Sequence, residues 1–150
     1  MTVARFFFLL GSLSLLSFLG CSQDSSHGRV SGTVLMDGQP VANAQVEFVP
    51  VAEGSTSYGR TDDQGRYSME YARDSAGASV GENEVRITTG DMDVDENERL
   101  VGVKETIPAK YNMSTELTFT VKPGSNTADF ELTSGGEIVD TTADAAEGED

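Results

Sequence analysis

Short runs in which apolar and polar residues alternate restrict the fold of this chain more than any other feature. The runs are residues 30–35, 44–48, 66–71, 84–88, 117–121 and 128–132. A period of two puts successive side chains on opposite faces of a β-strand, so each run can bury one face and leave the other in water. No run carries the 3.6-residue period of an amphipathic helix. The sequence therefore predicts an all-β fold.

Turn-forming residues separate these runs. Asp37-Gly38-Gln39-Pro40 and Pro123-Gly124-Ser125-Asn126 are turn sequences, and Thr61–Gly65 closes a hairpin. In that hairpin we expect Asp62 to accept hydrogen bonds from turn amides and Gly65 to adopt a positive φ. The spacing predicts about seven short strands in an antiparallel sandwich. Between the strands we expect loops at residues 51–57, 72–81 and 90–104, and an edge segment containing Pro at residues 107–112.

The first 21 residues carry a targeting signal. One Arg precedes an apolar block of about 14 residues, which is too short to cross a bilayer as a helix and matches the apolar region of a secretory signal. The ending Phe18-Leu19-Gly20-Cys21 resembles the bacterial lipoprotein signal. That resemblance implies removal of residues 1–20 and lipidation of Cys21. Ser22, rather than Asp, follows the Cys, which favours the outer membrane.

The charge of the chain narrows the class of partner. Removal of residues 1–20 takes away one Arg and no acidic residue, which leaves 9 basic and 25 acidic side chains and a formal charge of −16. That charge repels nucleic acid and anionic lipid headgroups. Cys21 is the only cysteine, so an internal disulfide is excluded. We expect a tether at residues 21–28 with a solvated His27, a domain at residues 29–132, and a disordered acidic tail at residues 133–150.

Three motifs resemble those of one family. They are Gly28-x-Val30-x-Gly32-x-Val34, Asp37-Gly38-x-Pro40-Val41-x-x-Ala44-x-Val46 and Thr61-Asp62-x-x-Gly65-x-Tyr67. Their spacing resembles that of carboxypeptidase-regulatory-like domains, which are similar to transthyretin (prealbumin). The resemblance covers about residues 28–132 and implies a seven-stranded Greek-key sandwich. Residues 107–112 and Phe130-x-Leu132 look like those of small bacterial lipoproteins built from one such domain. In peptidases this domain is an accessory module, so the resemblance implies no catalytic activity.

One pattern suggests catalysis. Gly77-Ala78-Ser79-Val80-Gly81 matches the G-x-S-x-G of a hydrolase nucleophile elbow, which requires a strand, a turn and a helix, and a His later in the chain. The only histidine, His27, precedes the Ser, and residues 72–81 have the Gly, Ala and Ser content of a loop. We therefore expect no catalytic residue here.

Two acidic segments suggest calcium. Residues 61–65 contain a fragment of a calcium loop, but the hairpin explains them sufficiently. Asp91, Asp93 and Asp95 have the spacing of the first three ligands of an EF-hand loop. Glu96, however, occupies the position where that loop needs Gly. We expect a solvated acidic loop, with weak Ca²⁺ binding as the open alternative. No other metal or cofactor site is indicated.

Two hypotheses for function remain. The first is a non-enzymatic, lipid-anchored protein of the cell envelope, with a structural or protein-interaction role and an unidentified envelope protein or polysaccharide as its partner. The second is a carbohydrate- or small-ligand-binding module. Exposed aromatic residues would favour the second, and Tyr58 is the one aromatic that the pattern assigns to neither the core nor an edge.

Overall fold

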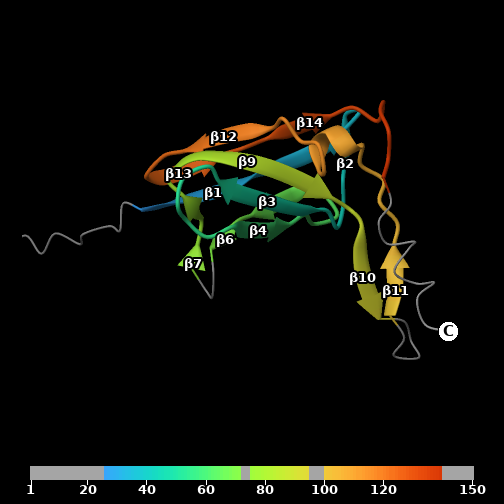
Figure 1. The fold of residues 1–150 in the computed structure, drawn as a ribbon, viewed down its shortest axis with the longest axis horizontal. Helices are drawn as coiled ribbons and strands as arrows, with labels where there is room; N and C mark the ends of the chain where they lie inside the picture. Colours follow the sequence, from blue (N-terminus) through green and yellow to red (C-terminus); the bar gives the residue numbers. More distant parts are fainter. Residues whose placement is uncertain (1–25, 72–74, 95–99, 140–150) are drawn as a thin grey trace, which may run out of the picture.

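The computed structural model describes residues 26–71, 75–94 and 100–139, and in them the chain forms two large β-sheets and a small one (Figure 1). The first sheet contains β1 (His27–Met36), β2 (Gln39–Pro40), β5 (Arg66–Ser68), β8 (Ala78–Ser79), β13 (Gly124–Thr127) and β14 (Phe130–Leu132). The second contains β3 (Gln45–Pro50), β4 (Ser57–Arg60), β6 (Glu70–Tyr71), β7 (Ser75–Ala76), β9 (Gly81–Thr88) and β12 (Thr118–Val121). The all-β prediction is confirmed.

The strand directions differ in part from the antiparallel prediction. Every pair of the second sheet, in the order β12-β9-β3-β4-β6-β7, is antiparallel. In the first sheet β1 pairs antiparallel with β2, β5 and β8, but parallel with β13 and β14. The parallel pairs arise because the turn at Pro123-Gly124 reverses the chain after β12. The chain then crosses to the other sheet and enters it in the direction of β1.

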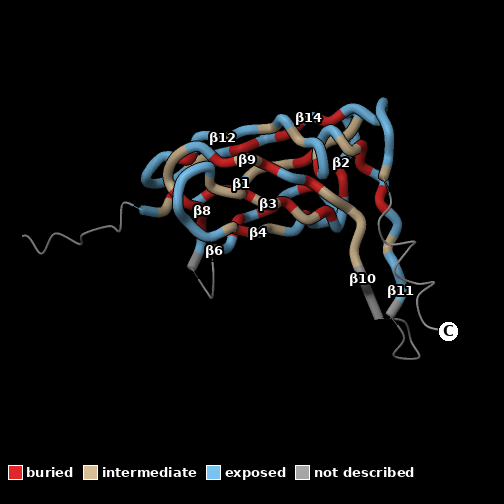
Figure 2. The backbone as a smooth tube through the Cα atoms, in the orientation of Figure 1, coloured by how far each residue is buried: buried red, intermediate tan, exposed pale blue. Residues whose placement is uncertain are grey.

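One hydrophobic core fills the space between the two sheets. Buried residues alternate with exposed or partly buried ones along β1, β3 and β9, as period two requires (Figure 2). Phe48 of the second sheet lies 6.3 Å from Phe130 of the first, measured between ring centroids, and 5.8 Å from Phe119. Such edge-to-face and tilted aromatic pairs add about 0.5–1.5 kcal/mol to the burial of the rings. The alternating runs therefore supply the core, as predicted.

Residues 90–104 form a hairpin rather than the predicted loop. β10 (Asp91–Val94) pairs antiparallel with β11 (Leu100–Val103), and the connection at residues 95–99 lies outside the described residues. Val94, Val101 and Val103 are β-branched and favour extended backbone. The hairpin projects from the end of the sandwich opposite to the start of β1 (Figure 1). After it, residues 107–112, which were predicted as an edge segment, contain the short 3₁₀ helix η1 (Ala109–Tyr111).

The predicted loop at residues 72–81 contains the short strands β7 and β8. Between them Gly77 has a φ of +122°, and a Cβ there would lie 2.3 Å from the carbonyl oxygen of Gly28. Glycine thus lets the chain pass from the second sheet to the first at this point. The Gly, Ala and Ser content of this segment predicted a loop and gave no sign of the strand pairing on either side of Gly77.

Both predicted limits of the domain also shift. β1 begins at His27, inside the predicted tether, so the ordered domain starts before residue 29. At the other end, the amide of Ala109 donates a 2.8 Å hydrogen bond to the carbonyl of Glu137, and Lys110 donates to Thr133. Residues 133–139 thus contact η1, and the disorder expected for residues 133–150 stays a prediction. Residues 140–150 and 1–25, with the predicted signal peptide, Cys21 and most of the predicted tether, lie outside the described residues.

Candidate functional site

The strand that follows the Thr61–Gly65 turn changes sheets part-way along its length. Arg66–Ser68 pairs with β1 in the first sheet, whereas Glu70–Tyr71 pairs with β4 in the second. Met69 lies between the two pairings and is buried; its amide donates to the carbonyl of Val30 at 2.9 Å. The outer faces of the two sheets therefore meet along this strand.

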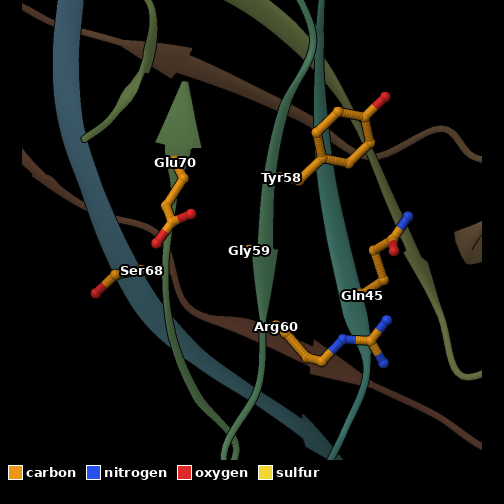
Figure 3. Close-up of a pocket in the computed structure, with 6 residues that line it drawn as sticks. All are labelled: Gln45, Tyr58, Gly59, Arg60, Ser68 and Glu70. Carbon is orange, nitrogen blue, oxygen red and sulfur yellow. The ribbon is translucent and has the colours of Figure 1, made fainter. Parts of the chain in front are cut away.

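A surface hollow of about 430 Å³ lies beside this change of sheet (Figure 3). It is lined by Gln45, Tyr58, Gly59, Arg60, Ser68 and Glu70. A Cβ on Gly59 would lie 2.8 Å from the carbonyl oxygen of Ser68, so glycine is what allows the crossing strand to come this close. Tyr58, directly opposite Glu70 in the ladder, is 50% exposed. The aromatic residue that the sequence left unassigned is thus on the surface.

Arg60 is held at the edge of the hollow by two neighbours. One guanidinium nitrogen donates to the backbone oxygen and the Oδ1 of Asn43, at 3.2 and 3.1 Å, and the other lies 2.6 Å from Asp91 Oδ2. Both charged side chains are more than 40% exposed, so this ion pair adds at most about 1 kcal/mol to stability. Its main effect is to orient the guanidinium, which has five N–H donors in all.

The hollow brings one aromatic side chain and several polar groups together. An exposed tyrosine offers an apolar ring face and a hydroxyl, and around it lie an amide, a guanidinium and a carboxylate that can donate or accept hydrogen bonds (Figure 3). Polar groups beside an exposed aromatic side chain can orient a ligand.

Ser79 of the G-x-S-x-G pattern does not lie on a nucleophile elbow. It is buried in β8, where its backbone pairs with His27, and the chain continues into β9 rather than into a helix. Its carbonyl accepts a 3.0 Å hydrogen bond from the side chain of Asn83. Ser79 is therefore placed as a structural residue of the sheet.

His27 is not the solvated linker residue that the sequence predicted. Its ring centroid lies 3.8 Å from that of Tyr71, with the planes tilted by 52°, and its Nδ1 is 2.7 Å from Ser26 Oγ. The polar neighbours of His27 in the sequence suggested a linker, but strand β1 extends further toward the N-terminus than its apolar residues indicate.

The hairpin interpretation of residues 61–65 is confirmed. Asp62 Oδ1 accepts hydrogen bonds from the amides of Gln64 and Arg66, each at 2.9 Å, and Oδ2 lies 2.9 Å from the Arg66 guanidinium. These contacts, the Arg66 amide foremost, lower the pKa of Asp62. Gly65 has a φ of +73°, as predicted. A carboxylate used in this way is a turn cap rather than a calcium ligand.

The second calcium candidate is only partly described. Asp91 pairs with Arg60, so it does not stand free as a cation ligand. The side chains of Asp93, Asp95 and Glu96 lie outside the described residues. In the part of the chain that the structure describes, no group of three or more His, Cys, Asp or Glu side chains could hold a metal ion.

Glu105 is a site that the sequence analysis missed. It is only 5% exposed, and its carboxylate joins both ends of the β10–β11 hairpin to the rest of the protein. The donors are Thr88 Oγ1, Thr89 N and Oγ1 (3.0 and 2.7 Å), Gly90 N (3.4 Å), Thr106 N (2.8 Å), Ile107 N (2.8 Å) and Asn112 Nδ2 (3.4 Å). Burial raises the pKa of Glu105, but the hydrogen bonds from Thr88, Ile107 and Thr89 outweigh it, and the pKa falls below its ordinary value. A single Glu in an unpatterned segment gave no signal of this role.

Comparisons with known proteins place the chain in no family. No family model matches it, and no curated protein matches it significantly. A crystal structure of a 9R-lipoxygenase from Cyanothece PCC8801 is similar over 72% of this chain, with 18% sequence identity and a TM-score of 0.38. The chain spans 16% of that lipoxygenase. At such a TM-score the similarity supports no conclusion about function.

Across the described residues there is no helix with the length and apolar character needed to span a membrane.

Proposed function

We propose that this protein is a lipid-anchored, non-enzymatic protein of the cell envelope, and that its β-sandwich binds an envelope partner. The sandwich would be the seven-stranded Greek-key domain of the carboxypeptidase-regulatory-like type. The two sheets around one core and the turns at Gly38 and Gly65 support that assignment. Lipid on Cys21 would hold the domain at the membrane, in the outer membrane if Ser22 acts as expected.

The observation that carries the binding role is the exposure of Tyr58 in the hollow beside Arg60 and Glu70. Tyr and Arg are enriched at the energetic centres of protein interfaces, because each offers contact area together with directional hydrogen bonds. The inward-facing residues of β3, β4 and β6 are covered without Tyr58. The exposed ring of Tyr58 is therefore not needed for packing of the core. We therefore place the contact surface on the outer face of β3, β4 and β6.

The position of the anchor fits this surface. Cys21 precedes the start of β1 by only a few residues. The start of β1 and the β10–β11 hairpin lie at opposite ends of the sandwich (Figure 1). An anchored domain would therefore direct its hairpin away from the membrane and its outer sheet faces sideways, toward neighbouring envelope components.

A second candidate function is the binding of a carbohydrate or another small ligand. It is favoured by the same exposed tyrosine, because an aromatic ring face with polar groups around it also suits a sugar ring. The two candidates differ in what should be found attached to this surface in cells.

Three measurements test the proposal. Mass spectrometry of the protein from its native membranes should find lipid on Cys21, and Cys21→Ser should move the protein to the soluble fraction. A photo-crosslinking amino acid at position 58 should form specific adducts in cells, whereas the same amino acid at Thr120, which is exposed on β12, should form none. An unmodified Cys21 on a membrane-bound chain, or equal labelling at both positions, would contradict the proposal.

A further inference from the structure

Three surface hollows meet at Ser68. The hollow around Tyr58 shares Arg60 and Ser68 with a second hollow of about 560 Å³ on the outer face of the first sheet. That second hollow shares Ser31 and Ser68 with a third of about 220 Å³, which reaches Asn126. The three hollows adjoin one another through these shared residues, and we call them together the Ser68 groove. It runs from β3 and β4, across the strand that changes sheets, to β13.

The floor of the groove carries a row of hydroxyl groups. Ser68 of β5 lies opposite Ser31 of β1, and Ser31 lies opposite Thr127 of β13. All three residues are exposed and lie on neighbouring strands, which are spaced about 4.8 Å apart. A hydroxyl both donates and accepts a hydrogen bond, so the row can bind a ligand that does the same at regular intervals.

The charges in the groove balance, although the chain is strongly acidic. Its charged lining residues are Arg29, Arg60, Arg66, Asp62, Glu70 and Asp129. Three positive charges thus face three negative ones, in a chain with a formal charge of −15. Arg66 is paired with Asp62 at 2.9 Å, and Asp129 accepts 2.8 Å hydrogen bonds from the amide and hydroxyl of Thr33. A neutral groove favours neither a polyanion nor a polycation.

The direction of the groove argues against an extended peptide. Peptides commonly bind by adding a strand to an open sheet edge, with apolar side chains in pockets. The Ser68 groove instead crosses the strands β13, β1 and β5 on a sheet face, where the backbone groups already pair with neighbouring strands. Its one exposed large apolar side chain is Tyr58.

We propose that the Ser68 groove binds a linear, uncharged, hydroxyl-rich polymer, which is the chemistry of a neutral glycan chain. Tyr58 stacks against the C–H face of a sugar ring, Gln45 and Arg60 hydrogen-bond to hydroxyls beside it, and the Ser68, Ser31 and Thr127 row binds the following units. This inference rests on the proposed binding role of the sandwich and specifies the class of its ligand.

The test is calorimetric titration of the full-length protein, purified from membranes in a detergent without sugar groups. The probes are cellohexaose, maltohexaose and chitohexaose, together with the disaccharide of each series. At least one hexasaccharide should bind, and its disaccharide should bind at least about tenfold more weakly, because it covers one hollow instead of three.

Matched variants locate the binding. Ser68→Phe fills the junction of the three hollows and should weaken binding of the hexasaccharide by at least about tenfold, as should Tyr58→Ala. Thr120→Phe makes the same exposed change on β12, away from the groove, and should bind like the natural protein. Thr127→Phe on β13 provides a second blocking variant if Ser68→Phe proves unstable by its thermal midpoint.

The proposal is overturned if no hexasaccharide binds, or if both blocking variants bind as tightly as the natural protein. A third outcome would also overturn it: position 58 crosslinks to an envelope protein, Ser68→Phe abolishes these crosslinks, and no saccharide binds. In that case the sandwich surface would still have a partner, so the proposed function would stand while the glycan proposal failed.

Discussion

Replacement of Glu105 tests how much its buried carboxylate contributes to the stability of the fold. The two carboxylate oxygens have different partners: Oε1 accepts from Thr89, Thr106 and Ile107, whereas Oε2 accepts from Thr88 and, at 3.4 Å, from Gly90 and Asn112. A glutamine can put its one carbonyl oxygen at the Oε1 position and keep the stronger set. Its NH₂ group then faces Thr88, whose hydroxyl can rotate to accept a hydrogen bond. A leucine can make none of these contacts.

The two variants should therefore differ in magnitude. Glu105→Gln loses the charge-assisted hydrogen bonds at one oxygen. This loss should lower the free energy of unfolding by about 1–2 kcal/mol. Glu105→Leu leaves the amides of Thr89, Thr106 and Ile107 without their acceptor, and each unsatisfied buried donor costs about 1–3 kcal/mol, partly recovered where water enters. We expect a loss of about 3–5 kcal/mol for Glu105→Leu, which is a large share of the roughly 5–15 kcal/mol of a typical domain.

The effect of Glu105→Gln should depend on pH. The pKa of Glu105 in the folded protein lies below the ordinary value of 4.5, so the folded state binds the proton less readily than the unfolded state. The resulting stabilisation is fully present above pH 4.5 and is lost as the pH falls through the folded-state pKa. Glutamine has no such titration. The difference in stability between the natural protein and Glu105→Gln should therefore be largest near pH 7 and should shrink at more acidic pH.

Urea unfolding followed by far-ultraviolet circular dichroism measures these differences at pH 7 and at a series of lower values, and it does not need tryptophan, which the chain lacks. Glu84→Gln is the matched control, because Glu84 is a half-exposed carboxylate that pairs with Arg86 at the surface. Equal stability of Glu105→Gln and Glu105→Leu would refute the reasoning from individual acceptors. A difference between the natural protein and Glu105→Gln that did not change with pH would refute the pKa argument.

Three further changes test the fold. Gly65→Val should lower the free energy of unfolding by about 2–4 kcal/mol in urea titrations, because Gly65 has a φ of +73° and a Cβ there would lie 2.5 Å from the carbonyl oxygen of Val34; an unchanged midpoint would contradict the turn geometry. Tyr67→Phe should cost about 1–2 kcal/mol, since it removes the 2.6 Å hydrogen bond from the hydroxyl to a buried backbone carbonyl. Truncation after residue 132 should lower the thermal midpoint, because η1 loses its hydrogen bond to Glu137, whereas truncation after residue 139 keeps that bond and tests residues 140–150 separately.

Local patterns were sufficient to predict the core and the turns. Val34, Val46, Phe48, Val85 and Ile87 are all fully buried, and each occupies the position that alternation assigned to the inner face. The reason is that alternate residues of a strand face opposite sides of the sheet, so neighbours in the sequence indicate which residues are buried. Turn chemistry is equally local, so the conformation of the Thr61–Gly65 segment could be predicted.

Pairing between distant segments could not be predicted in this way. The parallel entry of β13 and β14 beside β1 depends on where the chain crosses between sheets, which no local pattern specifies. The cluster at Glu105 likewise joins Thr88 and Thr89 to residues about 16 positions later in the chain. Each partner alone is an ordinary polar residue, and only the fold makes them a buried network. The Ser68 groove was missed for the same reason, because Ser31, Ser68 and Thr127 come from three separate strands.

The residues that build the candidate site and the residues that build the fold alternate along the same strands. On β4, Ser57 and Gly59 face inward, where Gly59 makes room for the crossing strand, while Tyr58 and Arg60 face outward into the hollow. On the crossing strand, Met69 is buried and Ser68 and Glu70 are exposed. Because exposed side chains on a strand contribute little to the core, the outward residues can change without loss of the fold. The turn and core motifs can therefore identify a sandwich without indicating a ligand, and the proposed glycan binding rests on the outward-facing side chains of β4, β5 and β1.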